Sequence, residues 1–187
     1  VSRCKNGDFF HGGNRSSVIT AVEYCCDVKE RKKQLCLPEK MMSASRHEHF
    51  IREALREAQK AYEAGEVPVG ALIVCNNRII ARAHNLSERL NDATAHAEMQ
   101  AITAASGFLG SKYLQDCTLY ATLEPCLMCA GAAFWAKIPF VIFGAGDPVN
   151  GFSRTGVPVL HPSARHSGGV LEKECAALLK RFFASRR

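Results

Sequence analysis

The sequence predicts a three-layer α/β domain, in which a central mixed sheet of about five strands carries helices on both faces. Two observations support this class of fold. The segment 69–83 contains two β-rich runs separated only by Asn76 and Asn77, residues that tolerate the positive φ of a tight hairpin turn. After this hairpin, segments with helical spacing alternate with short apolar runs that are typical of strands.

The first predicted elements are one helix and the two strands of the hairpin. From Ser45 onward, apolar residues recur at intervals of three and four until Gly65, and this period predicts an amphipathic helix. The runs 69–75 and 78–83 then form the hairpin, and we expect them to pair antiparallel.

A second helix and a third strand follow the hairpin. Thr94 can cap a helix that extends from about Ala95 to Ser106, and the glycine-containing segment 107–112 ends it. The run 118–123 is the next predicted strand.

The last part of the chain adds two helices and a strand. Pro125 is suited to the first turn of a helix, and Pro139 marks where that helix has ended. A continuous apolar strand covers 140–144. The segment 147–169 is rich in Gly, Pro, Ser and His and is interpreted mainly as a loop, before a final helix over 171–184.

The chain of 187 residues divides into two parts of different character. Residues 43–187 carry every pattern described above and are long enough for one catalytic domain. Residues 1–42 hold no helical or strand period for long, so we expect a poorly ordered N-terminal extension. One interpretation of this extension is that translation starts at Met41 or Met42, downstream of Val1.

Composition narrows the partners and the compartment. The formal net charge of +6 suits a polyanionic partner such as nucleic acid, although many ordinary proteins share this balance. The nine cysteines do not repeat as in small disulfide-bonded secreted domains, so free thiols and metal ligands fit better. No apolar stretch approaches the roughly 18 residues of a membrane helix, and the N-terminus lacks the apolar run of a secretory signal. We therefore expect a cytoplasmic protein with no membrane partner.

The strongest functional signal is one histidine and two cysteines with metal-ligand spacing. His96 offers an imidazole nitrogen, and Cys126 and Cys129 offer two thiolates. Three protein ligands leave the fourth position of a tetrahedral zinc ion open for water, which is the arrangement of a catalytic zinc. The two cysteines are three residues apart at a predicted helix start, so both can face one ion, and the positive end of the helix dipole favours their thiolates.

Glu98 stands two residues after His96 and is the candidate catalytic residue. It need not bind zinc, so it can take a proton from the activated water, protonate a ring nitrogen and help an amine leave as ammonia. The combination of His-x-Glu with Pro-Cys-x-x-Cys is the signature of the zinc-dependent nucleobase deaminases.

Each half of this signature is weak on its own. A Cys-x-x-Cys pair also occurs in redox sites and structural zinc sites, and His-x-Glu often arises by chance. A structural zinc would need a fourth protein ligand, for which His84 is the nearest candidate. The conjunction of the two motifs favours the catalytic zinc.

From about Arg46 to Arg187, the chain resembles the bacterial tRNA-specific adenosine deaminases of the cytidine and deoxycytidylate deaminase-like superfamily. Beyond the zinc signature, the shared motifs are Glu66-Val67-Pro68-Val69-Gly70, Asn76-Asn77-Arg78, Asp92-Ala93-Thr94-Ala95, Thr122-Leu123-Glu124, Gly131-Ala132, Glu174-Cys175-Ala176-Ala177-Leu178-Leu179 and Phe182-Phe183. The resemblance implies the cytidine-deaminase-like fold, one zinc ion per subunit, and hydrolysis of the wobble adenosine of tRNA to inosine. It also implies a homodimer in which the second subunit helps to form the RNA site.

The resemblance further implies three substrate contacts. Asn85 would hydrogen-bond the flipped base, the backbone around Ala97 would line the pocket, and Asp147 would lie near the backbone of the bound nucleotide. Without the resemblance, Asn85 is typical of a turn at a strand end and Asp147 of a solvated loop. Two departures weaken the implied RNA contacts: Gly146 stands where a basic residue is common, and 148–166 follows no family pattern.

The tRNA anticodon loop is the implied partner, bound single-stranded with its target base extruded. Basic residues near the C-terminus could contact its phosphates, although a charge run at a chain end is more often solvated. These residues are Lys180, Arg181, Arg186 and Arg187.

Two rival functions would use the same motifs. A deaminase of a free base or nucleotide, such as guanine, cytosine or deoxycytidylate, would share the catalytic residues but would close over its small ligand. A catalytically silent RNA-binding subunit would keep zinc only to stabilise its fold, and it would be expected to lack Glu98. The motifs near the C-terminus and the presence of Glu98 favour the tRNA-editing enzyme.

Overall fold

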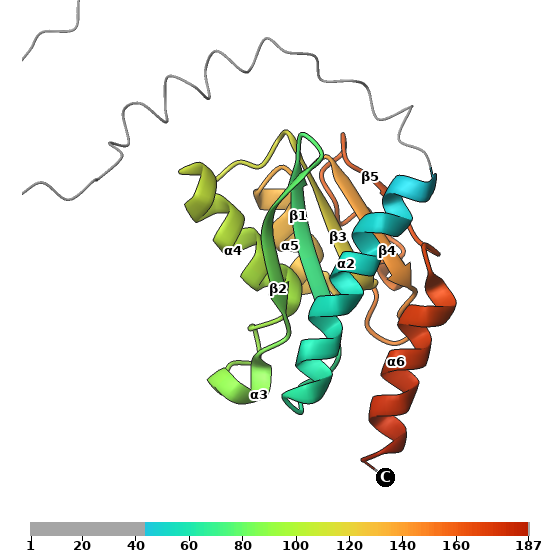
Figure 1. Ribbon diagram of the computed structural model, residues 1–187. Coiled ribbons are helices and arrows are strands. Elements are labelled where there is room, and N and C mark those ends of the chain that lie inside the picture. Colours follow the sequence, from blue (N-terminus) through green and yellow to red (C-terminus); the bar gives the residue numbers. More distant parts are fainter. Residues whose placement is uncertain (1–43, 187) are drawn as a thin grey trace, which may run out of the picture. The chain divides into compact units, whose positions relative to one another are not determined.

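A five-stranded mixed sheet lies between two pairs of helices, which confirms the predicted class of fold (Figure 1). The computed structural model describes residues 44–186, so the extension expected over 1–42 lies outside the described residues. Within the described range, no helix is long and apolar enough to cross a membrane. The elements in chain order are α2 (Ala44–Glu63), β1 (Gly70–Cys75), β2 (Arg78–His84), α3 (Ser87–Leu90), α4 (Ala97–Leu109), β3 (Cys117–Leu123), α5 (Leu127–Trp135), β4 (Phe140–Ala145), η2 (Phe152–Thr155), β5 (Arg165–Ser167) and α6 (Glu172–Ala184).

The strands are arranged in the order β2-β1-β3-β4-β5. β1 pairs antiparallel with β2 and with β3, whereas the pairs β3–β4 and β4–β5 are parallel. Asn76 and Asn77 have φ values of 48° and 61°, which confirms the predicted hairpin between β1 and β2. Because β3 and β4 are parallel neighbours, the chain leaves both strands at the same edge of the sheet.

The alternation of side chains along the strands explains the two helical layers. Leu72 and Tyr120 belong to the core between the sheet and the α2/α6 layer. Ile73 and Leu119, the adjacent positions in the same strands, belong to the core on the α4/α5 side. A side chain at Gly70 would collide with the backbone of α2, so this glycine lets the helix cross close over β1.

The start of α4 differs from the prediction. The helix begins after His96, which is its N-cap, and no side chain caps it by a hydrogen bond. The predicted cap, Thr94, instead donates from both its backbone N–H and its hydroxyl to the Asp92 carboxylate, at 2.7 Å each. Asp92 is closer to Thr94 than the N–H groups of the helix are, so the two residues form a turn. The helix then begins beyond this turn, with His96, two residues after Thr94, as its N-cap.

Other element ends also differ from the prediction. α4 continues past Gly107, which is exposed, and ends at Gly110, whose φ of 57° provides a left-handed cap. Lys137 has a φ of 56°, so α5 stops before the predicted Pro139. The loop predicted over 147–169 contains η2 and the edge strand β5, and the loop before α4 contains α3.

Candidate active site

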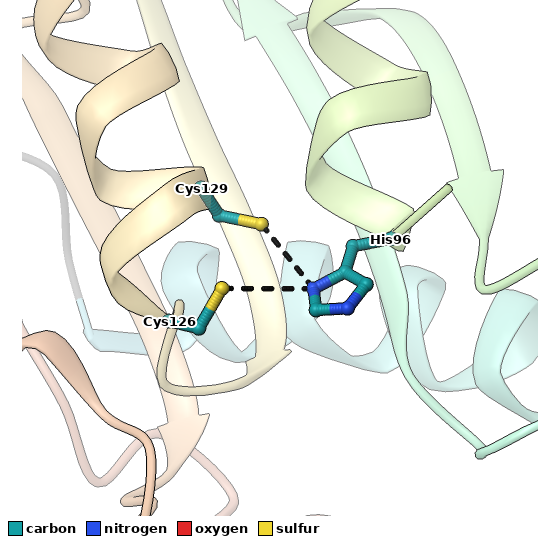
Figure 2. Close-up of side chains that lie close together, drawn as sticks. All are labelled: His96, Cys126 and Cys129. Carbon is teal, nitrogen blue, oxygen red and sulfur yellow. Dashed lines mark hydrogen bonds between the residues drawn. The ribbon is translucent and has the colours of Figure 1, made fainter. Parts of the chain in front are cut away.

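His96, Cys126 and Cys129 lie together where α4 and α5 begin (Figure 2). The Nδ1 atom of His96 lies 3.6 Å from the Sγ atom of Cys126 and 3.6 Å from the Sγ atom of Cys129. The three potential ligand atoms all lie within 4.8 Å of one another. Within residues 44–186, no other group of three or more His, Cys, Asp or Glu side chains has this geometry.

The spacing of these atoms fits a tetrahedral zinc ion. Bonds of about 2.3 Å to sulfur and about 2.05 Å to nitrogen, at the tetrahedral angle, place the nitrogen about 3.6 Å from each sulfur. The observed nitrogen–sulfur distances are both 3.6 Å. One imidazole and two thiolates are also a donor set that zinc prefers, and they leave a fourth position open.

The surroundings of the thiols favour metal binding. Cys126 is the N-cap of α5, where the free N–H groups and the positive end of the helix dipole favour an anion. A hydrogen bond from Cys129 lowers the pKa of Cys126 to about 4, and the same contact raises the pKa of Cys129 far above its usual range. The hydrogen bond between His96 and Cys126 raises the pKa of His96. Zinc binds thiolates and neutral imidazole, so a metal ion bound here would displace the protons that these side chains carry.

His84, the candidate fourth ligand of a structural zinc, lies outside this cluster. Its Nδ1 atom lies 3.6 Å from Oε2 of Glu57 on α2. A closed four-ligand site through His84 therefore gains no support from the structure.

The carboxyl group of Glu98 is buried beside the candidate metal ligands His96, Cys126 and Cys129, hereafter the metal-ligand cluster. Burial raises the pKa of Glu98 to about 7, and the nearby Cys126 adds to the increase whereas His96 opposes it. A carboxyl group that titrates near neutrality can both accept and donate a proton, which is what a proton shuttle requires.

His96, Glu98 and Cys126 line a cavity of about 740 Å³, which lies within the usual size range of ligand pockets. Asn85, Ala97 and Asp147, the three substrate contacts expected from the sequence, line the same cavity. Lys180 and Phe183 of α6 line it as well, so the cavity extends from the metal-ligand cluster to the C-terminal helix.

A buried carboxylate fixes the orientation of Asn85. The Nδ2 atom of Asn85 donates to Oε2 of Glu66 at 3.2 Å and to Oγ of Ser87 at 2.8 Å. Glu66 also accepts from the backbone N–H groups of Glu88 and Arg89, at 3.1 and 2.7 Å, near the start of α3. Because the carboxylate only accepts, the amide nitrogen of Asn85 must be the atom that faces it.

One carboxylate oxygen of Asp147 is engaged within its own loop. It accepts from the backbone N–H groups of Val149 and Asn150, at 2.9 and 3.0 Å. The backbone N–H of Asp147 donates in turn to Oε2 of Glu124 at 3.1 Å. The structure thus brings Asp147 to the cavity wall, where its side chain also stabilises the turn that follows it.

The basic residues near the C-terminus have different surroundings. Lys180 lines the cavity. Arg181 donates to Oε1 of Gln59 on α2 at 3.1 Å, and Arg186 donates to a backbone carbonyl in the loop after α2. Both arginines also lie over aromatic rings. Arg187 lies outside the described residues, so Lys180 is the member of this group that the structure places at the cavity.

The roles of two buried carboxylates were not predicted from the sequence: Glu124 lines the cavity, and Glu66 lies behind Asn85, which lines it. Both stand in motifs on which the resemblance rests, but their hydrogen-bond partners are about twenty or more residues away in sequence. The signal that could have identified them is an acidic residue inside an otherwise apolar motif, because a buried carboxylate needs nearby donors.

Comparisons with known proteins agree with this geometry. Residues 44–145 match the family model for the cytidine and deoxycytidylate deaminase zinc-binding region. The tRNA-specific adenosine deaminase of Bacillus subtilis strain 168 is 48% identical over 145 residues, which cover 75% of this chain and 90% of that protein.

Two solved structures are also similar to the chain. One comes from studies of A-to-I editing by tRNA A34 deaminases at the wobble position of transfer RNA; it is 42% identical, covers 70% of this chain and 99% of its own, and has a TM-score of 0.66. The other is a guanine deaminase from Bacillus subtilis, which is 34% identical, covers 75% of this chain and 93% of its own, and has a TM-score of 0.53.

Proposed function

The chain belongs to the tRNA-specific adenosine deaminases, within the cytidine and deoxycytidylate deaminase family, and we propose that it hydrolyses the wobble adenosine of a tRNA anticodon loop to inosine and ammonia. One observation carries this function: His96, Cys126 and Glu98 line the same cavity, so a metal site and a proton shuttle meet at one place.

We propose that His96, Cys126 and Cys129 hold one zinc ion in each subunit. Their nitrogen–sulfur spacing of 3.6 Å and the open fourth position support this assignment. A zinc ion held there supplies a Lewis acid that activates a water molecule at neutral pH.

Glu98 moves the protons in the proposed reaction. Its carboxylate takes one proton from the attacking water and gives it to ring nitrogen N1, while the water oxygen bonds to carbon C6. It then carries the second water proton to the exocyclic amine, which leaves as ammonia, so that C6 keeps the oxygen as the carbonyl of inosine. The burial of Glu98 and its pKa of about 7 support this role, because both directions of transfer are then accessible.

The proposed substrate occupies the cavity from the metal-ligand cluster outward. The extruded adenine lies beside Asn85 and the backbone at Ala97, and its nucleotide backbone lies near Asp147. Lys180, at the α6 end of the cavity, is positioned to contact a phosphate of a neighbouring nucleotide. A cavity that reaches α6 offers room beyond the target base, as an RNA strand requires.

We also propose that two copies pair through the outer face of α5 and that both contribute to the tRNA site. The sequence of α5 contains no charged residue, and Leu127 and Trp135 are 56% and 76% exposed. Large exposed apolar side chains on one element are typical of protein contacts. The cytoplasm is the proposed compartment, because free thiols persist there and the tRNA substrate is present.

The experiment that tests the function uses purified, zinc-loaded protein and an unmodified transcript of the arginine tRNA with a wobble adenosine. Nucleoside analysis should find inosine at the wobble position, and a transcript with guanosine at that position is the matched control. The rival function is suggested by the similarity to a guanine deaminase. Ammonia release from guanine, with no inosine in the tRNA, would replace the proposed function with the rival.

A further inference from the structure

A buried carboxylate joins the loop after β4 to the segment that carries one proposed zinc ligand. Glu124 is 6% exposed and stands two residues before Cys126, just beyond β3. Its Oε2 atom accepts from the backbone N–H of Asp147 at 3.1 Å, and its Oε1 atom accepts from the backbone N–H of Ser153 at 2.9 Å. The two oxygens therefore hold the two ends of the segment 147–153.

Backbone contacts at the same place reinforce this link. The N–H of Phe152 donates to the carbonyl of Pro125 at 3.0 Å, and Gly151 forms an isolated antiparallel bridge with Cys126. A side chain at Gly151 would collide with the carboxyl group of Glu124. A glycine at this position is thus what lets the carboxylate and the loop approach each other.

The segment 147–153 forms one wall of the cavity through four consecutive residues, Asp147 to Asn150. Given the proposed function, we infer that Glu124 is a positioning residue, which holds this wall at a fixed place relative to Cys126 so that it can bind the nucleotide. Both carboxylate oxygens accept from backbone N–H groups of the segment 147–153, so the inferred role of Glu124 acts through this segment.

A carboxylate is required for this role because it accepts hydrogen bonds at both oxygens. Glutamine has nearly the same shape but offers one acceptor oxygen and one donor NH₂ group. In Glu124→Gln, one of the two backbone N–H groups would face another donor and remain unsatisfied in a buried place. One end of the segment 147–153 should then detach, while the volume of the side chain is unchanged.

The first test compares Glu124→Gln with Glu57→Gln. Glu57 is a matched control because it is also buried, accepts from Lys60 and lies on α2 outside the cavity lining. Glu124→Gln should raise KM for the tRNA transcript roughly tenfold, with kcat within about twofold and zinc content unchanged. Amide hydrogen exchange at Asp147 or Ser153 should accelerate by roughly tenfold or more. The control should change neither KM nor these exchange rates.

A second variant reaches the same contact from the loop. Gly151→Ala should push the carboxyl group of Glu124 from its place and reproduce the effects on KM and exchange. Gly107→Ala is its control, since nothing lies within 4 Å of a Cβ there. If Glu124→Gln fails to fold, the comparison of Gly151→Ala with Gly107→Ala still tests whether Glu124 holds the wall.

Three outcomes would overturn the inference. KM and exchange rates that match the wild type in both variants would mean that the carboxylate does not hold the wall. Loss of zinc from Glu124→Gln would mean that Glu124 acts on the metal site. Unchanged amide exchange with a lower kcat would assign Glu124 to the chemistry. A wild-type protein that makes no inosine would contradict the proposed function, whereas the exchange rates would still decide whether Glu124 anchors the wall.

Discussion

The buried polar side chains that line the cavity or lie directly behind its wall differ in what their hydrogen bonds accomplish. Glu66 and Glu124 are satisfied by backbone N–H groups, so they position the segments that they contact. Asn85 is fixed by one of these carboxylates and lines the cavity. Glu98 is buried beside the proposed metal ligands, and its raised pKa suits proton transfer in place of structural anchoring.

Proton transfer by Glu98 can be separated from metal binding by a variant of the same shape. Glu98→Gln keeps the shape of the side chain but removes its ability to shuttle protons, so kcat should fall by about a thousandfold or more. Zinc content, measured by atomic absorption, should stay near one ion per chain, because Glu98 is not a proposed ligand. A variant that loses its zinc would show instead that Glu98 contributes to metal binding.

The second prediction concerns Asn85. Asn85→Ala should raise KM for the tRNA, by roughly tenfold, because a hydrogen bond to the base is lost. Asn85→Asp should be more damaging, because a second carboxylate would face the buried Glu66, which now accepts from the Asn85 amide. Thermal unfolding should therefore show a lower Tm for Asn85→Asp than for Asn85→Ala. The reverse order of Tm values would contradict the orientation of the amide.

The sequence predicts those parts of the site whose residues lie close together in the chain. His96 and Glu98 are two residues apart, and Cys126 and Cys129 are three apart, so one motif and one helical turn suffice to place each pair. The carboxylate of Glu66 finds its partners in the segment 85–89, which reaches it only through the β1–β2 hairpin. The local spacing of residues in the sequence does not predict hydrogen bonds between segments so far apart.

Among the elements, α6 both packs on α2 and lines the cavity. Arg181 donates to Gln59 and lies over Tyr62, so it helps to dock α6 on α2. Lys180, the adjacent residue, lines the cavity. Because adjacent helical residues point about 100° apart, one turn can serve both docking and substrate binding.

The third prediction separates these two roles. Lys180→Ala should weaken tRNA binding and reduce the slope of log Kd against log salt by about one, because one phosphate contact is lost. Arg181→Ala should leave that slope unchanged and lower Tm by about 2–4 °C, because it loses a cation–π contact and a hydrogen bond. Equal salt slopes for wild type and Lys180→Ala would remove Lys180 from the RNA site.

The boundaries of helices and strands were predicted correctly where neighbouring residues alone determine the backbone conformation. The Asn76-Asn77 turn requires only positive φ at two residues, and the structure confirms it. The start of α4 was predicted wrongly, because Thr94 has a closer partner in Asp92 than in the helix N–H groups. β5 was not predicted because it has only three residues, all of them exposed, and so shows no alternation of buried and exposed positions. Its strand conformation depends on pairing with β4.

At the scale of the whole molecule, the parallel pair β3–β4 determines where the cavity lies. The chain leaves β3 toward Cys126 and leaves β4 toward Asp147, at the same edge of the sheet. β2 runs in the same direction as β3 and β4, so the segment after it also emerges here and brings His96 to this edge as the N-cap of α4. The layered fold therefore brings together the candidate metal ligands and one wall of the cavity from three segments that are distant in sequence.

The last prediction concerns the outer face of α5 and the assembly of two copies. Trp135 is 76% exposed on a helix without charged residues, so in a dimer it would be covered by the partner. Trp135→Lys should weaken dimerisation by roughly 30-fold or more, because it removes an aromatic anchor and places a charge in an apolar contact. Sedimentation velocity over a range of concentrations measures this change. Phe108→Lys is the matched control, because Phe108 is also a large exposed apolar side chain, 53% exposed, on a different helix near the end of α4. If both subunits form the RNA site, Trp135→Lys should also raise KM for tRNA at protein concentrations where the variant is monomeric, and KM should recover as the concentration increases. A wild-type protein that sediments as a monomer at every concentration, with full activity, would rule out the proposed dimer and confine the tRNA site to a single chain.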